Sequence, residues 1–484
     1  MSPIELTILI SYFSVLFLLT LFGAHRYVLT IMFYRNRKPF TPKTRFSEEN
    51  LPHVTVQLPV FNEKYVLRRL VEAVSQFEYP SNRLEIQILD DSTDETQEIG
   101  KALAEEFREM GHDIVHIHRV DRTGYKAGAL EAGTQVAKGD LLAVFDADFL
   151  PPPHFLQRTV HAFSDEEIGM VQVRWGHINR DYSMLTKSQA LFLDGHFAIE
   201  HAARYHSGRF FNFNGTSGIW RRQCITDAGG WQHDTITEDL DLSYRAQLAG
   251  WKFAYINEVE SPAELPVEMN AFRTQQHRWA KGSIETAKKL LPRVLKSELP
   301  FHVKSEAMFH LTGNLSYLLL VTLALLMPMS VYIRIQHNWH HTLIADLPFL
   351  IGGTVSLLIF YACSQKEVGQ PWISRSGLVP IALTIGAGMS LNNCKAVLEA
   401  LVGYRTEFTR TPKYNVQSKL DNWKAKLYKG HKTWLPYAEL AIAIYITVII
   451  GFVVYKQSYL SLPFLLMFQL GFLYVSLSSI LQRR

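Results

Sequence analysis

Five apolar runs, each about as long as a membrane crossing, divide this 484-residue chain into a membrane part and a soluble part. A helix needs ~20 predominantly apolar residues to cross a bilayer core. The runs occupy residues 4–22, 315–333, 347–364, 434–455 and 460–481, and none occurs between residues 40 and 300. We therefore expect an N-terminal transmembrane anchor (residues 1–38), a soluble domain (39–300) and a C-terminal transmembrane region (301–484).

Composition narrows the class of protein further. The first apolar run has no basic segment before it and no small-residue cleavage site after it, which predicts a retained anchor rather than a signal peptide. Forty-nine Lys and Arg against 45 Asp and Glu give a net charge of +4, too close to neutral for a nucleic-acid partner. The three cysteines, Cys224, Cys363 and Cys394, fit neither a metal spacing nor a disulfide framework, which agrees with a soluble part in reducing cytosol.

The placement of basic residues predicts which side of the membrane each connector faces. Residues 403–432 carry eight Lys and Arg with two acids, whereas residues 335–345 carry no Lys or Arg. By the positive-inside tendency the first segment is cytoplasmic and the second lies outside. A further apolar stretch at 378–401 has Asn, Lys and Glu at helical spacing in its second half, so we expect an interfacial helix there. Five crossings follow, with the N-terminus outside; a sixth span at 378–401 is the alternative.

Short apolar runs alternate with helical patterns in the soluble part. The runs lie at residues 54–58, 85–89, 114–118 and 141–145, and helical patterns follow the first three at 63–77, 94–110 and 125–137. This alternation predicts an α/β fold with a doubly wound sheet, in which ligands bind at the carboxyl ends of the strands. No Gly-x-Gly-x-x-Gly follows the first run, which argues against an ordinary dinucleotide site.

Carboxylates follow three of the four predicted strands. Glu63 follows the first strand, Asp90 and Asp91 the second, and Asp146 and Asp148 the fourth. Mg²⁺ and Mn²⁺ prefer carboxylates together with phosphate oxygens. The last pair therefore predicts a divalent metal site that would neutralise a leaving nucleotide diphosphate.

Two residues near the predicted metal and phosphate site, Asp148 and Lys126, also have simpler explanations. Asp148 stands shortly before a predicted helix, where a capping Asp is common. Lys126, in the stretch GYKAGAL, places positive charge near the phosphates in one interpretation and is a solvated lysine at a helix start in the other.

The sequence Thr237-Glu238-Asp239 stands immediately before an amphipathic helix. In one interpretation Thr237 caps the helix while the two acids complement its dipole. In the other, a carboxylate takes the proton from an acceptor hydroxyl as that hydroxyl attacks the anomeric carbon of a sugar. The residues alone leave both interpretations open.

Gln275-x-x-Arg278-Trp279 stands just before a basic amphipathic stretch at residues 280–296. That stretch has apolar residues on one face and lysines and arginines elsewhere, which predicts an interfacial helix beneath anionic headgroups. Arg278 is a planar donor suited to a diphosphate, and Trp279 offers a flat apolar face to a sugar ring. The alternative is an Arg–Trp pair that only anchors a helix at the interface.

The order and spacing of four motifs resemble the membrane-embedded processive glycosyltransferases of family 2, which include cellulose, hyaluronan and chitin synthases and the cellulose-synthase-like glucan and mannan synthases. The motifs are DDS at 90–92, DAD at 146–148, TED at 237–239 and QxxRW at 275–279. The resemblance covers about residues 50–300. It implies a glycosyltransferase A-type domain inserted between transmembrane helices, with a nucleotide-sugar donor and Mg²⁺ or Mn²⁺ as cofactor.

The resemblance also implies a role for each motif residue. It places the donor near the strand ends, the metal at the DAD motif and the proton transfer at the TED motif. The implied roles are nucleotide contact for Glu63, Asp90, Asp91 and Lys126, metal or nucleotide contact for Asp146, metal binding for Asp148, catalysis for Asp239 beside Glu238, and substrate contact for Gln275, Arg278 and Trp279.

A second resemblance lies in the basic C-terminal segment. The stretch from Phe408 to Lys413, FTRTPK, is similar to the Phe-x-Val-Thr-x-Lys gating loop of cellulose synthases, with Arg410 in place of valine. This implies that residues 404–432 form a cytoplasmic gating-like loop whose Thr411 and Lys413 close over the bound nucleotide. Five residues in the stretch FFNFNGTSG are candidates for lining the acceptor path: Phe211, Phe213, Asn214, Gly215 and Thr216.

The leading function is an inverting, processive β-glycosyltransferase in the plasma membrane. On the cytoplasmic side it would transfer glucose or mannose from UDP-glucose or GDP-mannose to a growing β-glucan or β-mannan. It would then export the polymer through its own membrane spans, which membrane lipids surround. The alternative is a single transfer to a membrane lipid, as in ceramide glucosyltransferases, which share a similar Gln-x-x-Arg-Trp. A non-catalytic transporter or receptor is disfavoured because the apolar runs hold few ionisable residues.

Overall fold

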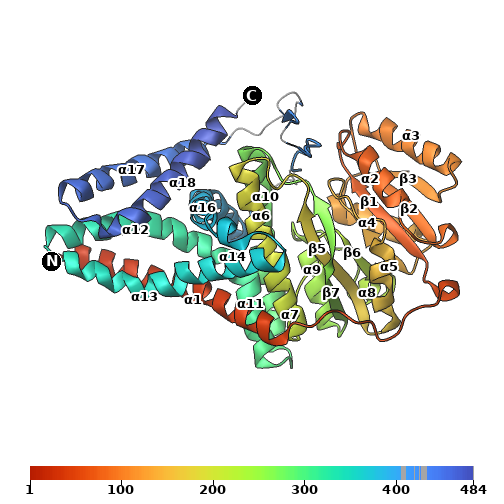
Figure 1. Cartoon of the computed structure of the whole chain (residues 1–484), viewed down its shortest axis with the longest axis horizontal. Helices are drawn as coiled ribbons and strands as arrows, with labels where there is room; N and C mark the ends of the chain where they lie inside the picture. Colours follow the sequence, from red (N-terminus) through yellow and green to blue (C-terminus); the bar gives the residue numbers. More distant parts are fainter. Residues whose placement is uncertain (405–409, 419, 424–425, 427–432, 483–484) are drawn as a thin grey trace.

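The computed structural model describes residues 1–404, 410–418, 420–423, 426 and 433–482. Figure 1 shows a sheet with flanking helices at one end of the molecule and a group of long helices at the other. Helix α1 (Pro3–Asn36) precedes the sheet domain in sequence, and the remaining long apolar helices follow it. The sheet domain is thus inserted between apolar helices, as the sequence predicts.

The sheet has seven strands in the order β3-β2-β1-β4-β6-β5-β7. The first four strands are parallel to one another, whereas β6 runs antiparallel to both of its neighbours. The strands are β1 (Val54–Val60), β2 (Leu84–Asp90), β3 (Ile114–His118), β4 (Leu141–Val144), β5 (Ile168–His177), β6 (Gly218–Arg221) and β7 (Lys252–Ala263). The four predicted strands and the α/β class are confirmed. β5, β6 and β7 were not predicted, and the antiparallel β6 makes the sheet mixed.

Helices cover both faces of the sheet and connect it to the apolar helices (Figure 1). The three predicted crossover helices appear as α2, α3 and α4; the first two are shortened at both ends and α4 by one residue at its end. The helices of the sheet domain are α2 (Leu67–Ser75), α3 (Thr96–Glu109), α4 (Tyr125–Val136), α5 (Phe155–Thr159), α6 (Met184–Asp194), α7 (Ala202–His206), α8 (Arg222–Asp227), α9 (Glu238–Leu248) and α10 (Met269–Lys296), with a π-helical turn η4 (Gly195–His201) between α6 and α7.

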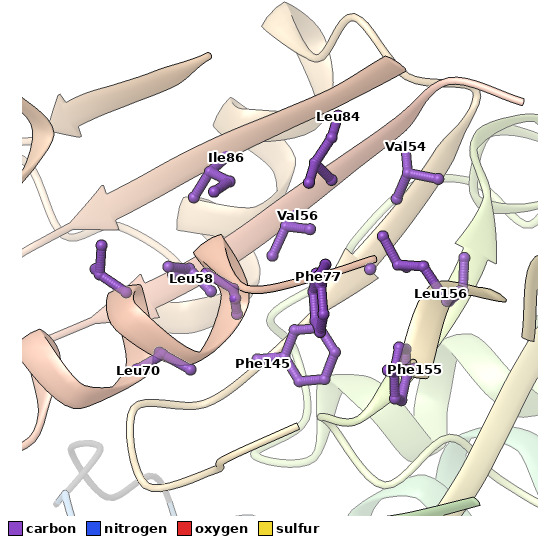
Figure 2. Packing of buried hydrophobic residues seen from close by; sticks show 14 of the residues in the cluster. Val54, Val56, Leu58, Leu70, Phe77, Leu84, Ile86, Phe145, Phe155 and Leu156 are labelled. Carbon is purple, nitrogen blue, oxygen red and sulfur yellow. The ribbon is translucent and has the colours of Figure 1, made fainter. Parts of the chain in front are cut away.

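Alternating strand residues build two cores, one on each face of the sheet. Val56 and Leu58 of β1 pack with Phe77, Phe145 and Phe155 on one face (Figure 2). Because successive side chains of a strand point to opposite faces, other residues of the same sheet join the second core around α4, α6 and α9. Burial on both faces fixes the strands rigidly, so the loops at their carboxyl ends are held at one edge.

Five helical segments among the described residues are long and apolar enough to cross a membrane. They are Pro3–Asn36, Phe301–Gln336, Ile344–Glu367, Leu435–Tyr455 and Tyr459–Leu481. They coincide with the five apolar runs and fit a membrane protein. The corresponding elements after the sheet domain are α11 (Phe301–Thr312), α12 (Ser316–Gln336), α13 (Leu347–Leu350), α14 (Ser356–Glu367), α17 (Leu435–Tyr455) and α18 (Leu462–Leu481); a short α15 (Trp372–Ser376) follows α14.

The stretch expected to be an interfacial helix is α16 (Val379–Val402), which packs against α10, α12 and α18. Asn392 Nδ2 donates to the carbonyl oxygen of Arg273 at 3.1 Å, so this polar face meets α10. A Cβ on Gly388 would lie 2.2 Å from Gly471 O, so α16 and α18 approach closely where neither has a side chain. The polar residues are therefore explained by helix packing, while the number of crossings stays a prediction.

The basic stretch at 280–296, where we expect an interfacial helix, forms the second half of α10. Its apolar face is covered by protein: Leu290 and Val294 pack with residues of α9 and α11. Lys288 Nζ donates to the carbonyl oxygens of Ala400 and Leu401, both at 2.9 Å. Lys288 therefore binds the carboxyl end of α16, while the expected interfacial position of this stretch stays a prediction.

Candidate active site

A cavity opens at the carboxyl ends of β1, β2 and β4, between these loops, the start of α9 and the middle of α10. It brings together motif residues that lie far apart in the sequence. The predicted site residues that line it are Glu63, Asp91, Lys126, Asp146, Asp148, Glu238, Asp239, Gln275, Arg278, Trp279, Thr411 and Lys413.

The loop after β1 carries Glu63 into the cavity. Asn62 adopts a positive φ of 54°, and its backbone N–H donates to Ser92 Oγ at 2.8 Å, which ties this loop to the end of β2. Glu63 is 8% exposed. Burial raises the pKa of Glu63 to about 7, against the opposing effect of the nearby Arg410 cation. The charge of a bound ligand would therefore readily change the ionisation of Glu63.

The two acids after β2 have different surroundings. Asp91 lines the cavity, and Arg119 donates to its two carboxylate oxygens at 2.8 and 2.6 Å. Asp90 is 1% exposed and does not line this cavity; its oxygens meet His116 Nε2 at 2.9 Å and the backbone N–H of Ser92 at 2.8 Å. The structure therefore places Asp91 at the site and Asp90 in a supporting position beneath it.

Asp146 and Asp148 follow β4 and carry the negative charge of the cavity. Lys126 Nζ lies 2.5 Å from Asp146 Oδ1 and donates to Gly215 O at 2.9 Å. Although burial lowers the pKa of Lys126, the carboxylate of Asp146 outweighs it and raises that pKa above its usual value. Lys413 forms an ion pair with Asp148. Helix α5 begins at Phe155, with His154 at its N-cap, so Asp148 does not cap it.

These carboxylates fit a divalent cation. Both are paired with an ammonium group, which shows that this edge of the cavity favours positive charge. Mg²⁺ and Mn²⁺ are usually held by one or two carboxylates and complete their ligands with substrate phosphates. Asp146 and Asp148 supply such a pair beside a cavity that has further cationic groups for a diphosphate.

Thr237, Glu238 and Asp239 form the turn that begins α9. Thr237 occupies the N-cap position but makes no side-chain capping bond there, and Asp239 Oδ1 accepts from the backbone N–H of Leu240 at 2.8 Å. Burial, followed by the neighbouring Glu238 carboxylate, raises the pKa of Asp239 to about 7. Burial also raises the pKa of Glu238. A carboxylate with a pKa near neutrality is suited to general-base catalysis.

A glycine lets the main chain approach this base closely. Gly215 has φ +80°, and a Cβ there would lie 3.0 Å from Asp239 Oδ2. A second close approach joins α9 to α10, because a Cβ on Gly282 would lie 2.4 Å from Thr237 Cγ2. The turn is thereby enclosed on two sides, which explains the burial of its acids.

The Gln275, Arg278 and Trp279 side chains project from one face of α10 into the cavity, since residues three and four apart share a helix face. All three are half-buried. Arg278 lies in the field of Glu238, Asp146 and other carboxylates of the cavity. The helix thus presents a planar cation and an aromatic face beside the candidate base.

The described part of the gating-like loop reaches into the same cavity. Arg410 donates to the carbonyl oxygens of Phe61 and Asn62, so it docks on the loop after β1 through polar contacts where valine would dock through apolar ones. Thr411 is 2% exposed. Tyr414 donates its backbone N–H to Glu264 Oε1 at 2.9 Å. Phe408, the first residue of the loop motif, lies outside the described residues.

A larger cavity of about 950 Å³ adjoins the first and continues between the apolar helices. Some residues line both cavities and mark the place where the two meet. The shared lining consists of Trp175, Leu193, Asn214, Thr237, Asp239, Gln275 and Trp279. Of the residues expected on an acceptor path, Asn214 lines both cavities, whereas Phe211 and Phe213 belong to the core and Thr216 is buried.

Two residues that line the cavity, Arg122 and Glu264, and one that supports it, Arg119, were missed from the sequence. Arg122 stacks on Phe61 with its Cζ 3.3 Å from the ring centroid, and Arg119 holds Asp91. Both follow β3, so the strand-end rule that identified the acids would have found them had basic residues been sought too. Glu264 gives no such signal, because β7 was not recognised as a strand; it accepts from Arg69 Nη2 at 2.9 Å.

Comparisons with known proteins agree with this arrangement. Residues 52–282 match the family model described as glycosyltransferase like family 2. Glucomannan 4-beta-mannosyltransferase 1 of Oryza sativa subsp. japonica is 41% identical over 252 residues, covering 51% of this chain and 48% of that protein. Glucomannan 4-beta-mannosyltransferase 2 of Arabidopsis thaliana is 39% identical over 266 residues, covering 54% and 50%. The chain therefore spans about half the length of the curated relatives it matches.

One solved structure supports the fold. The mannosyltransferase PcManGT from Pyrobaculum calidifontis, in complex with GDP-Man and Mn²⁺, superposes with a TM-score of 0.51 at 17% identity, covering 81% of this chain and 99% of that one. At this identity the likeness concerns the fold alone. It confirms the predicted glycosyltransferase-type α/β domain.

Proposed function

Because residues 52–282 match the model of the family 2 glycosyltransferases, we propose that this protein is a membrane-embedded, inverting β-glycosyltransferase that extends a β-mannan or β-glucan. The names of its relatives favour mannose, from GDP-mannose, over glucose from UDP-glucose. The catalytic domain faces the cytoplasm at the plasma membrane, and the polymer leaves through the apolar helices. These relatives are matched over half their length, so donor and product are parts of the proposal.

The proton transfer belongs to Asp239. An acceptor hydroxyl at the junction of the two cavities gives its proton to this carboxylate as the oxygen attacks the anomeric carbon. The nucleotide diphosphate leaves on the opposite face of the sugar ring, where Arg278 and Lys126 offer donors to its oxygens. One displacement without a protein nucleophile inverts the anomeric centre, so an α-linked donor gives a β-glycoside.

Asp146 and Asp148 are the residues that would hold the divalent cation, as the family 2 domain implies. A Mg²⁺ or Mn²⁺ ion there supplies positive charge to the departing diphosphate. The chain's own contribution is to fix the two carboxylates at the end of β4, with Asp146 N–H donating to Thr216 Oγ1 at 2.9 Å. Trp279 orients the acceptor ring by stacking.

The observation that carries the polymerase proposal is the place of Asp239. It lines both the cavity with the acidic motifs and the cavity of about 950 Å³ between the apolar helices. A volume near the upper end of ordinary ligand pockets, ~300–1,000 Å³, accommodates more than one sugar ring. An acceptor chain can therefore extend from the base into the helices.

The second candidate is a single transfer to a membrane lipid, whose acyl chains would occupy the same larger cavity. Purified protein in lipid vesicles, given GDP-mannose and UDP-glucose separately, distinguishes the two by mass spectrometry of the products. The proposal expects β-linked polymer from one donor, sensitive to an endo-β-mannanase or endo-β-glucanase. A product consisting of one sugar on a lipid would replace it with the lipid-modifying function.

A further inference from the structure

One rim of the first cavity is built by the loops after β1, β2 and β3. We call it the outer rim: Phe61, Asp91, Arg122 and Tyr125, all of which line the cavity. Phe61 follows β1, Asp91 follows β2, and Arg122 and Tyr125 follow β3. The outer rim therefore collects side chains from three neighbouring strand ends.

The order of the strands separates the outer rim from the end of the cavity that suits a diphosphate. The sheet runs β3-β2-β1-β4, and Asp146 and Asp148 follow β4. Neighbouring strands lie ~4.8 Å apart, so the end of β3 is about 14 Å from the end of β4. A nucleotide with its diphosphate at Asp146 and Asp148 thus has room to extend its base along the strand ends toward the outer rim.

Two aromatic rings hold Arg122 on this rim. Its Cζ lies 3.3 Å from the ring centroid of Phe61 and 5.2 Å from that of Tyr125. At the shorter distance the guanidinium rests directly against the Phe61 ring, an arrangement that suits the flat, delocalised cation of arginine. The Phe61 ring covers the guanidinium on one side, while the N–H groups of Arg122 stay at the edge of the group.

The hydrogen-bonding capacity of Arg122 is unused within the part of the chain that the structure describes. Its Nε is buried and donates to no atom there, and its guanidinium makes no ion pair there. The neighbouring Arg119, by contrast, donates to both carboxylate oxygens of Asp91. Buried donors are normally paired, because an unpaired one is costly. Arg122 therefore offers donors to a ligand in the cavity.

A guanine base matches these donors. Its O6 and N7 are two neighbouring acceptors, and an arginine binds both at once through two N–H groups. Uracil offers one acceptor, O4, with a C–H group beside it, so it takes only one of the two hydrogen bonds. The Asp91 carboxylate adds an acceptor on the same rim for the N–H groups of a base.

We propose that Arg122, stacked on Phe61, selects the guanine base of the donor by donating to its O6 and N7. This inference rests on the proposed function and deepens it, because it assigns the choice between GDP-mannose and UDP-glucose to one residue. The contact with the base sets which donor binds and takes no part in the proton transfer.

The test measures dissociation constants by calorimetric titration of purified full-length protein at one fixed Mg²⁺ concentration. The probes are GDP, UDP and 7-deaza-GDP, in which a C–H group replaces N7. The wild type should bind GDP about tenfold or more tightly than 7-deaza-GDP, as expected for a lost hydrogen bond to a charged donor. This comparison needs no variant, so it decides the matter even where a substitution impairs folding.

Arg122→Met removes the donors and keeps an unbranched side chain against Phe61. It should lower the preference for GDP over UDP about tenfold, because guanine loses two hydrogen bonds and uracil at most one. The ratio between the constants for GDP and 7-deaza-GDP should fall close to one, because the variant has no donor for N7. Arg122→Lys keeps the charge without the planar pair of donors, so it should not restore the preference for GDP.

Arg68→Met is the matched control for the loss of an arginine from the sheet domain. Arg68 lies on α2, its side chain is 54% exposed and pairs with Glu106, and it does not line the cavity. This variant should leave all three dissociation constants within about twofold of the wild type.

Two results would overturn the inference. The first is a wild type that binds GDP and 7-deaza-GDP equally well. The second is an Arg122→Met variant that loses the same factor for GDP, 7-deaza-GDP and UDP, which is the behaviour of a phosphate contact or of a purely structural residue.

The products made in vesicles judge the proposed function separately. A wild type that shows the N7 effect but adds one sugar to a lipid keeps the inference and loses the polymerase. A wild type that makes β-glucan from UDP-glucose and binds UDP more tightly than GDP keeps the polymerase and loses the inference.

Discussion

Asp239 shows how a single residue acquires a role from its surroundings. It is enclosed by Gly215 on one side and by α10 on the other, beside the Glu238 carboxylate. Asp239→Asn should lower kcat by ~10²-fold or more and leave nucleotide binding nearly unchanged, because the lost proton acceptor acts in the transition state. Turnover assays and nucleotide titration on the same preparation check this. Near-normal synthesis would remove Asp239 from the proton transfer.

The pH dependence of the reaction follows from the same residue. The charged groups around Asp239 are Glu238 on its own helix, Lys126 from α4, Asp146 after β4 and Arg278 from α10. Because the folded pKa is raised to about 7, the base is protonated below that pH and ionised above it. We expect kcat/KM to fall about tenfold per pH unit below neutrality. A profile that stays flat well into the acid range would exclude Asp239 as the base.

The metal prediction also belongs to single residues. Asp148→Ala should abolish activity at any practical Mg²⁺ or Mn²⁺ concentration, and chelation by EDTA should silence the wild type, because the diphosphate would lack its counter-charge. Asp140→Ala is the matched control, since Asp140 immediately precedes the other end of β4 and its side chain is 86% exposed. Synthesis that persists in EDTA would remove the cation from the mechanism.

At the scale of secondary-structure elements, the sequence predicts well how strands and helices alternate. It predicts poorly which elements contact one another. β1 and β2 are buried along their whole length and are rich in Val, Ile and Leu, so their composition reveals them as strands. β7 carries Glu258 and Glu260 in its second half, and β6 has the sequence GIWR with an arginine at its end, so neither gives a clear apolar run. The acids of the site were predictable because strand ends share one edge of a sheet.

Residues held by distant contacts could not be predicted in this way. Lys288 has the spacing of a lipid-facing lysine, yet it binds the carboxyl end of α16. Asp90 stands beside Asp91 in the motif, yet it turns toward His116 beneath the cavity. The spacing of residues along a helix or strand predicts the face on which a side chain lies. The partner of that side chain depends on which other element packs against that face.

The contact between α10 and α17 gives a prediction about elements. Arg273 Nη1 donates to Glu439 Oε2 at 2.7 Å, and the two side chains are 4% and 0% exposed. Arg273→Met leaves an unpaired buried carboxylate and should cost about 3–5 kcal/mol of stability, whereas Arg273→Met with Glu439→Leu should cost clearly less. Thermal unfolding in detergent measures both, with the exposed Arg293→Met as control. Equal losses in the single and double variants would refute the coupling.

In the whole molecule, helix α10 is one of several helices that join the sheet domain to the group of apolar helices. α10 carries Gln275, Arg278 and Trp279 at the active site, and it also packs on α11, α16 and α18. The resemblance to family 2 glycosyltransferases, first drawn from four short motifs, is confirmed by the match over residues 52–282. The motifs could not predict the larger cavity, because it lies between several helices and depends on how these helices pack together.

The last prediction concerns the segment between α16 and α17, whose described residues contact the sheet domain. Arg410 docks on the loop after β1 and Lys413 pairs with Asp148, so this segment covers the donor side of the cavity. If it acts as a lid that opens and closes for each sugar, it excludes water and aligns the donor. Replacing Phe408, Thr411 and Lys413 by alanine should then reduce both polymer yield and length in reconstituted vesicles, and weaken nucleotide-sugar binding.

The competing account is a basic surface attracted to anionic lipid. Such a surface contributes ~1 kcal/mol per basic residue and is indifferent to which lysine is lost. A control variant that replaces Lys424, Lys429 and Lys432 by alanine removes more positive charge from the same segment but none of the motif. A lid predicts that only the motif variant shortens the polymer. Equal effects of the two variants on yield and length, or no effect of either, would defeat the gating role.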